Sequence, residues 1–207
     1  IATIPTGNGI AVTPMQMLSV YMTIANDGLK VDPMIIKSVI DEFGDRKEME
    51  PTGFKQVISA QTASQLNTML QGVVEDGTGT KAAVPGYSVA GKTGTSRKAP
   101  YVDKKYMASF AGFAPATNPR IAVIVILDEP GTAIYGGTVA APVFSRLMSS
   151  ALRVIGVTPD RPNQGLSVTN TIDEALLPKD KVATTTEITP TTKPKSATNL
   201  LNQTQND

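Results

Sequence analysis

Three strand-like segments follow one another in the middle of the chain, and only short connections separate them. They span residues 88–97, 106–113 and 120–127 and carry the β-branched and aromatic residues that favour strands. Pro100 and the pair Asn118–Pro119 mark the two connections as loops. Parallel neighbours need a crossover of about a dozen residues or more, so these segments predict an antiparallel meander.

The last of these segments is apolar at every position from 121 to 127 and shows no alternation. A strand that is apolar on both faces is typically covered on both faces, so we expect a central strand with helices on each side. Apolar residues recur at helical spacing after Pro142, as far as Gly156, and supply one such cover.

Two amphipathic helices are predicted in the first third of the chain. Thr13–Pro14 offers an N-cap followed by a proline at the first helical position, and this helix is expected to end by Gly28. Ser59 begins the second, which is expected to stop at Gly77. A short exposed hairpin with its turn at Gly44–Asp45 lies between them. The expected fold class is therefore α+β, an antiparallel sheet flanked by helices.

The composition changes after Val157. Residues 158–207 are rich in Thr, Pro and Asn, and such a segment buries too little apolar area to offset the entropy of ordering it. We therefore predict one domain over residues 1–157 and a disordered tail over residues 158–207.

The composition also excludes several kinds of function. With 19 basic and 18 acidic residues, the chain has no broad charge that would attract nucleic acid. The absence of His and Cys removes Ser-His-Asp and Cys-His catalysis and most zinc or iron sites. We expect no metal and no cofactor, and any catalysis must use Ser, Thr, Lys, Tyr or carboxylates.

The segment that begins at Gly86 is compatible with two kinds of active site. Residues 86–93 satisfy the phosphate-loop pattern G-x-x-x-x-G-K-T, and residues 92–94 spell K-T-G, an element of penicillin-binding proteins and class A β-lactamases. A phosphate loop needs a buried strand before it and a helix after it, whereas Pro85 precedes the segment and Pro100 leaves no room for the helix. We therefore predict no nucleotide site. Taken alone, K-T-G would more often be part of an ordinary strand with a solvated lysine than part of an active site.

Further motifs surround K-T-G in a fixed order. They are GNGIAVTPMQM at 7–17, EDGTGTKA at 75–82, VAGKTGTSRK at 89–98, FAGFAP at 110–115, DEP at 128–130, YGG at 135–137 and AAPVF at 140–144. Together they resemble the carboxy-terminal part of the transpeptidase domain of class B penicillin-binding proteins, in particular the division-specific peptidoglycan D,D-transpeptidases. The resemblance implies the penicillin-binding and serine β-lactamase-like fold, incomplete at its amino-terminal side.

The resemblance also implies roles for residues of the K-T-G strand. Lys92 would contribute positive charge and take part in proton transfer, while the hydroxyls of Thr93 and Thr95 would hold the carboxylate of a substrate or β-lactam. The backbone N–H of Thr95 would be an oxyanion donor. Gly94 would let the strand approach the ligand, and Tyr135–Gly136 would form a wall of the site.

The nucleophile of the family is missing, because the chain contains neither S-x-x-K nor S-x-N. Ser88, Ser96 and Ser109 lie near the proposed site in sequence, but none has a lysine three residues later. In the family these elements precede the region where this chain begins, and its first residue is Ile1 rather than Met. We therefore expect a carboxy-terminal fragment that is inert by itself.

The functional expectation is a D,D-transpeptidase of septal cell-wall synthesis that acts on peptidoglycan stem peptides and binds β-lactams. The resemblance further implies division-complex membrane proteins as partners and a location on the extracytoplasmic face of the bacterial cell membrane. Two alternatives stay open. One is a non-catalytic partner-binding module, and the other is a β-lactamase or D,D-carboxypeptidase.

Overall fold

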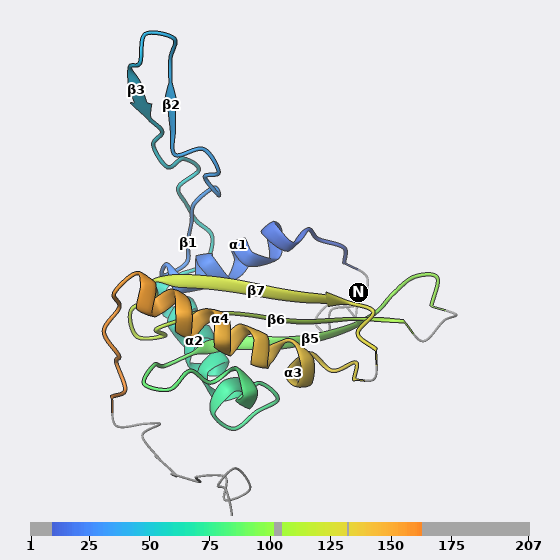
Figure 1. The fold of residues 1–207 in the computed structure, drawn as a ribbon. Helices are drawn as coiled ribbons and strands as arrows, with labels where there is room; N and C mark the ends of the chain where they lie inside the picture. Colours follow the sequence, from blue (N-terminus) through green and yellow to red (C-terminus); the bar gives the residue numbers. More distant parts are fainter. Residues whose placement is uncertain (1–9, 102–104, 132, 163–207) are drawn as a thin grey trace, which may run out of the picture. The chain divides into compact units, whose positions relative to one another are not determined.

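The structure is a computed structural model that describes residues 10–101, 105–131 and 133–162 (Figure 1). In chain order its elements are α1 (Pro14–Ala25), β1 (Leu29–Lys30), β2 (Ser38–Ile40), β3 (Arg46–Glu48), β4 (Lys55–Gln56), α2 (Ala60–Glu75), the 3-10 turn η2 (Thr80–Ala82), β5 (Ala90–Arg97), β6 (Tyr106–Ala114), β7 (Ile121–Asp128), α3 (Gly136–Val139) and α4 (Ala141–Val154). Most of the predicted tail lies outside the described residues.

The three predicted strands form one antiparallel sheet in the order β5-β6-β7. Gly94 pairs with Ser109 across the first ladder, and Phe110 pairs with Val125 across the second. The meander is confirmed. Among the described residues β6 is the middle strand and β7 is an outer strand, so the expected central position of the apolar strand stays a prediction. Its apolar run reflects coverage on two faces, by α4 and α1, and does not report its neighbours in the sheet.

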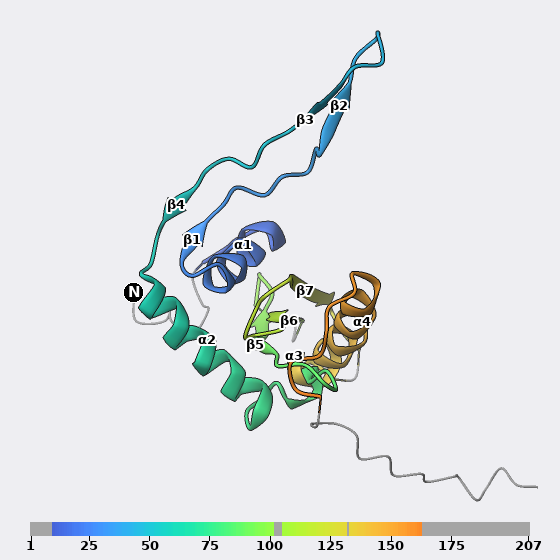
Figure 2. The same ribbon diagram turned by 90° about the vertical axis from the view of Figure 1, so that its left-hand side faces the viewer.

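Helices cover both faces of the sheet, as Figure 2 shows, with α1 and α2 on one side and α4 on the other. On the α4 side the rings of Phe110 and Phe144 lie 4.7 Å apart between centroids, and both are fully buried. On the other side Phe113 packs with Tyr21 of α1 and Leu70 of α2. This arrangement is the predicted α+β class.

The helix starts follow the sequence signals. Thr13 caps α1 in a reciprocal capping box, in which the Gln16 N–H donates to Thr13 Oγ1 at 3.2 Å and the Thr13 N–H donates to Gln16 Oε1 at 2.9 Å. Ser59 caps α2 by accepting from the Thr62 N–H at 3.1 Å. None of the described helices combines the length and the apolar character needed to cross a membrane.

The predicted hairpin is also present. β2 and β3 pair antiparallel, and β1 and β4 pair nearer to the helices. Its side chains are exposed, with Ile35 at 87% and Phe43 at 84% of their full accessibility. The hairpin therefore adds nothing to the core.

Contacts of the domain continue past Val157, the boundary that we expected. The Tyr87 hydroxyl donates to the Val157 carbonyl oxygen at 2.7 Å, and the Arg161 N–H donates to the Gly86 carbonyl oxygen at 2.9 Å. Asp160 and Arg161 therefore contact the domain, and the expected boundary itself stays a prediction. Composition assigned them to the tail because their contacts are polar and involve residues far away in sequence.

Candidate active site

The K-T-G triplet lies in β5, at an edge of the described sheet. The strand is buried at Ala90 and Gly91 and becomes exposed at Lys92, so it leaves the core where the triplet begins. β5 continues past Thr93 to Arg97, so no helix starts directly after the Lys-Thr pair as a phosphate loop requires. The edge position is what a substrate backbone would need in order to pair with this strand.

Three polar side chains meet at Thr93. Its hydroxyl lies 2.9 Å from the Thr78 hydroxyl and 3.2 Å from Lys92 Nζ. Lys92 Nζ also donates to the Thr93 carbonyl oxygen at 3.3 Å. The result is an exposed cluster of one ammonium group and two hydroxyls, which is suited to an anionic group such as a carboxylate.

Thr78 was not among the predicted site residues. It lies between Gly77 and Gly79, where an added Cβ would come within 2.9 Å and 3.1 Å, respectively, of the Val73 backbone. The tight turn after α2 therefore requires small residues at both positions and brings Thr78 to β5. In the sequence, Gly77 and Gly79 predict a tight turn, but they do not predict that this turn brings Thr78 to β5.

The turn at Tyr135–Gly136 also reaches β5. The Gly136 N–H donates to Thr95 Oγ1 at 3.2 Å. A Cβ on Gly136 would lie 2.2 Å from the Ser109 carbonyl oxygen and 2.5 Å from that of Gly94, so only glycine allows this close approach. Tyr135 precedes α3 and is 66% exposed. The start of α3 thus lies beside Thr95. The role of Tyr135–Gly136 as a wall of the site stays a prediction.

Gly94 has a packing reason to be glycine. A Cβ at this position would lie 2.4 Å from Ser109 Oγ on the paired strand. The side chain that is absent at Gly94 therefore makes room for a neighbour within the sheet. The predicted role in ligand approach stays a prediction.

Beyond the triplet, an ion-pair cluster holds the far end of β5. Lys98 Nζ lies 2.7 Å from Asp128 Oδ1 and 2.8 Å from Glu129 Oε1, and Lys105 Nζ lies 3.5 Å from Glu129 Oε2. The hydrogen bonds to Asp128 and Glu129 raise the pKa of Lys98, and the bond from Lys98 is the largest cause of the lowered pKa of Glu129. The two carboxylates at the end of β7 are therefore paired with lysines.

Of the three serines near the site in sequence, Ser88 and Ser109 are enclosed, whereas Ser96 in β5 is exposed. Ser88 is fully buried and hydrogen-bonded to Asp160, so its hydroxyl is not accessible to a substrate. The Ser109 hydroxyl is packed beside Gly94. Within the described ranges no group of acidic side chains comes together in a way that could hold a metal ion.

Comparison with known sequences identifies the family. Residues 1–149 match the penicillin binding protein transpeptidase domain. The chain belongs to this family. The transpeptidase-domain chain is 42% identical to stage V sporulation protein D of Bacillus subtilis over 169 residues, which cover 79% of this chain and 26% of that protein. It is 39% identical to the probable peptidoglycan D,D-transpeptidase PenA of Neisseria flavescens over 166 residues, which cover 78% of this chain and 39% of that protein.

Solved structures agree with this assignment. Penicillin binding protein 3 of Mycobacterium tuberculosis, complexed with aztreonam, matches with a TM-score of 0.69 and 39% identity over 77% of this chain and 39% of that one. The transpeptidase domain of penicillin-binding protein 3 from Burkholderia pseudomallei matches with a TM-score of 0.67 and 43% identity, covering 78% and 48%, respectively. The fold is that of the transpeptidase domain, and the chain spans well under half the length of these two curated relatives, 26% and 39%.

Proposed function

We propose that the chain is the carboxy-terminal part of a serine-type peptidoglycan D,D-transpeptidase. The observation that carries the proposal is the cluster of Lys92, Thr93 and Thr78 at β5, an edge strand of the described sheet, with the start of α3 beside Thr95. A relative named as a probable D,D-transpeptidase supports the reaction class, and the solved complexes of penicillin binding protein 3 with aztreonam and ampicillin support β-lactam binding.

The reaction would need a serine from outside this chain. Its hydroxyl oxygen attacks the carbonyl of the penultimate D-Ala, the bond to the terminal D-Ala breaks, and that D-Ala leaves with the serine proton on its amine. An amine of a neighbouring stem peptide then attacks the ester, forms the cross-link and returns a proton to the serine. The chain would supply binding and electrostatic stabilisation for both steps.

Each of the predicted site residues has a place in this scheme. The substrate backbone pairs with the edge of β5, while the terminal carboxylate accepts hydrogen bonds from the hydroxyls of Thr93 and Thr95. Lys92 provides positive charge and helps to move the proton, and the Thr95 N–H stabilises the oxyanion. Gly94 has no side chain that would keep the substrate away from the strand, and Tyr135–Gly136 borders the site on the side of α3.

The proposal extends to cellular context. A role in septal cell-wall synthesis would place the intact protein on the extracytoplasmic face of the bacterial membrane, with division-complex membrane proteins as partners. The similarity to penicillin binding protein 3 and to a sporulation protein supports a role in septum formation rather than in β-lactam hydrolysis.

Labelling with a fluorescent penicillin tests the function. We expect no covalent adduct on the 207-residue chain and a stable adduct on a protein extended upstream to include a serine element. Thr95→Ala in the extended protein should slow labelling about tenfold or more, since a hydrogen bond to a charged group is lost. Thr68→Ala, which removes an exposed hydroxyl within α2, is the matched control.

Two outcomes would contradict the proposal. A labelled serine within residues 1–207 would show that the nucleophile is not external. An extended protein that folds but does not label would favour a non-catalytic, partner-binding module.

A further inference from the structure

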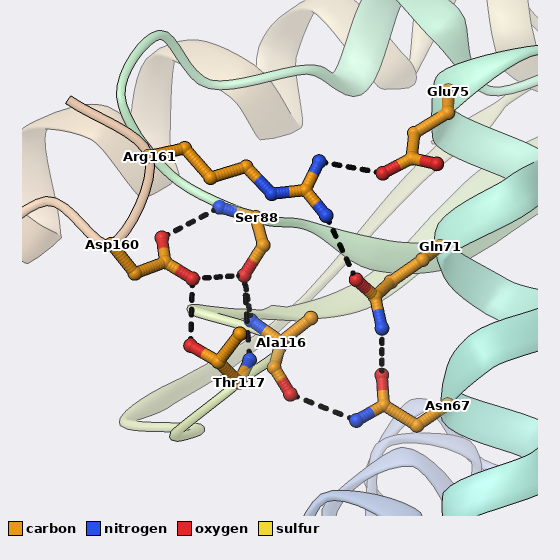
Figure 3. A network of polar contacts seen from close by, with 8 residues as sticks. All are labelled: Asn67, Gln71, Glu75, Ser88, Ala116, Thr117, Asp160 and Arg161. Carbon is orange, nitrogen blue, oxygen red and sulfur yellow. Dashed lines mark hydrogen bonds and ion pairs between the residues drawn. The ribbon is translucent and has the colours of Figure 1, made fainter. Parts of the chain in front are cut away.

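The segment that follows α4 contacts the start of β5 through Asp160, as Figure 3 shows. One carboxylate oxygen accepts the Ser88 N–H at 2.8 Å, and the other accepts the hydroxyls of Ser88 and, at 2.6 Å, Thr117. The family match ends at residue 149, so it assigns no role to this segment. Asp160 joins parts of the chain that are 72 residues apart.

Ser88 connects Asp160 to the loop between β6 and β7. Its fully buried hydroxyl accepts the N–H groups of Ala116 at 2.8 Å and Thr117 at 3.3 Å. A buried hydroxyl that both donates and accepts tolerates little displacement, because each lost bond leaves a polar group unpaired. Asp160 therefore fixes the chain two residues before β5 begins.

The next residue, Arg161, contacts one face of α2. Its guanidinium lies 2.5 Å from Glu75 Oε1 and 3.1 Å from Gln71 Oε1. Gln71 donates to Asn67 Oδ1 at 3.2 Å, and Asn67 donates to the Ala116 carbonyl oxygen at 2.8 Å (Figure 3). Residues spaced by four lie on one helix face, so this row connects the end of α2 with the same loop that Ser88 contacts.

The contacts of Asp160 and of Arg161 both affect one contact in the candidate active site, the one between Thr78 and Thr93. Glu75 is the last residue of α2, and Thr78 follows three residues later with its hydroxyl 2.9 Å from that of Thr93 in β5. Arg161 restrains the helix end that leads to Thr78, and Asp160 restrains the strand that carries Thr93. The two consecutive residues thus hold both sides of the Thr78–Thr93 contact from outside the site.

We propose that Asp160 and Arg161 are positioning residues that keep Thr78 and Thr93 in register for ligand binding. The proposal rests on the proposed function for its catalytic consequence, but the restraint itself is a property of this chain. Neither residue touches the cluster at Lys92, so neither is catalytic. A role in general stability alone would predict loosening of the entire domain, whereas positioning predicts loosening confined to the two anchored segments.

Hydrogen exchange on the 207-residue chain tests the restraint directly. Arg161→Gln and Asp160→Asn should increase amide exchange in residues 76–80, in residues 91–96 and in the β6 amides that pair with β5, with little change in β7. Arg161→Lys should restore part of the protection, because the positive charge beside Glu75 is kept. Arg153→Gln is the control, since this arginine bonds only within α4 among the contacts of the described residues. Unchanged exchange, or an increase spread evenly over the sheet, would overturn the proposal.

The acylation rate of the upstream-extended protein tests the consequence. Small misplacements of binding groups cost large factors in rate, so we expect about a tenfold slower reaction of Arg161→Gln with fluorescent penicillin at equal folded fraction. A charge swap, Glu75→Arg with Arg161→Glu, should recover most of that rate. Labelling that is equal in parent and variants would overturn the positioning role. If the parent fails to label, the proposed function fails, and the exchange experiment still decides the restraint.

Discussion

The two ends of strand β5 are held in different ways. At the inner end, Ala90 and Gly91 are buried in the sheet between the helices that cover its two faces, and the buried hydroxyl of Ser88 is held by hydrogen bonds. At the outer end, Thr95 is exposed and contacts the Gly136 N–H, and Lys98 pairs with surface carboxylates. Packing therefore sets where the strand lies, while the exposed half keeps its polar groups available to a ligand.

The largest effect on stability should come from adding a side chain at the buried inner end of β5. A Cβ at Gly91 would lie 2.7 Å from the Phe110 ring and from the Ala111 carbonyl oxygen, so Gly91→Val should lower the free energy of unfolding by about 3 kcal/mol. Urea unfolding measures the change. Gly72→Ala is the control, since nothing lies within 4 Å and the helix should gain about 0.5–1 kcal/mol. A tolerated Gly91→Val would show that packing does not fix this end.

An intermediate effect on stability is expected when the pH is lowered and the Asp160 carboxylate becomes protonated. Burial alone would raise the pKa of Asp160, but hydrogen bonds from Ser88 and Thr117 outweigh it, and the pKa is lowered overall. A lowered folded-state pKa stabilises the fold above the usual pKa of an aspartate, and this contribution disappears as the pH falls through the lowered value. Thermal unfolding followed from neutral to acidic pH should therefore show a smaller loss of Tm for Asp160→Asn than for the parent. Parallel curves would mean that the carboxylate does not anchor Ser88.

The smallest effect should come from the outer ion pairs. Exposed pairs contribute little and are screened by salt, so Lys98→Gln should leave the urea midpoint unchanged within error. Amide exchange of residues 95–101 should nevertheless rise at low ionic strength, and 1 M NaCl should produce the same rise in the parent. Arg46→Gln, which breaks an ion pair in the hairpin, should leave these amides unchanged. A large loss of stability in Lys98→Gln would remove the contrast between the two ends.

The sequence could predict what depends on local pattern. The helix caps at Thr13 and Ser59 and the three strands, the first of which carries K-T-G, follow from short-range chemistry and the family resemblance. The outer position of β7 could not be derived, because an apolar run reports two covered faces and is silent about neighbouring strands. The contacts of Asp160 and Arg161 were missed because they reach 43 to 90 residues back along the chain and leave no periodic signal.

The outer edge of β7 has a consequence for handling the protein. Seven consecutive apolar residues, 121–127, lie on a strand whose second edge has no strand partner among the described residues. Such an edge is a template for cross-β stacking between molecules. Arg120 and Asp128 flank the run as charged gatekeepers, so self-assembly of this chain into fibrils should depend on those two charges and accelerate when either is neutralised.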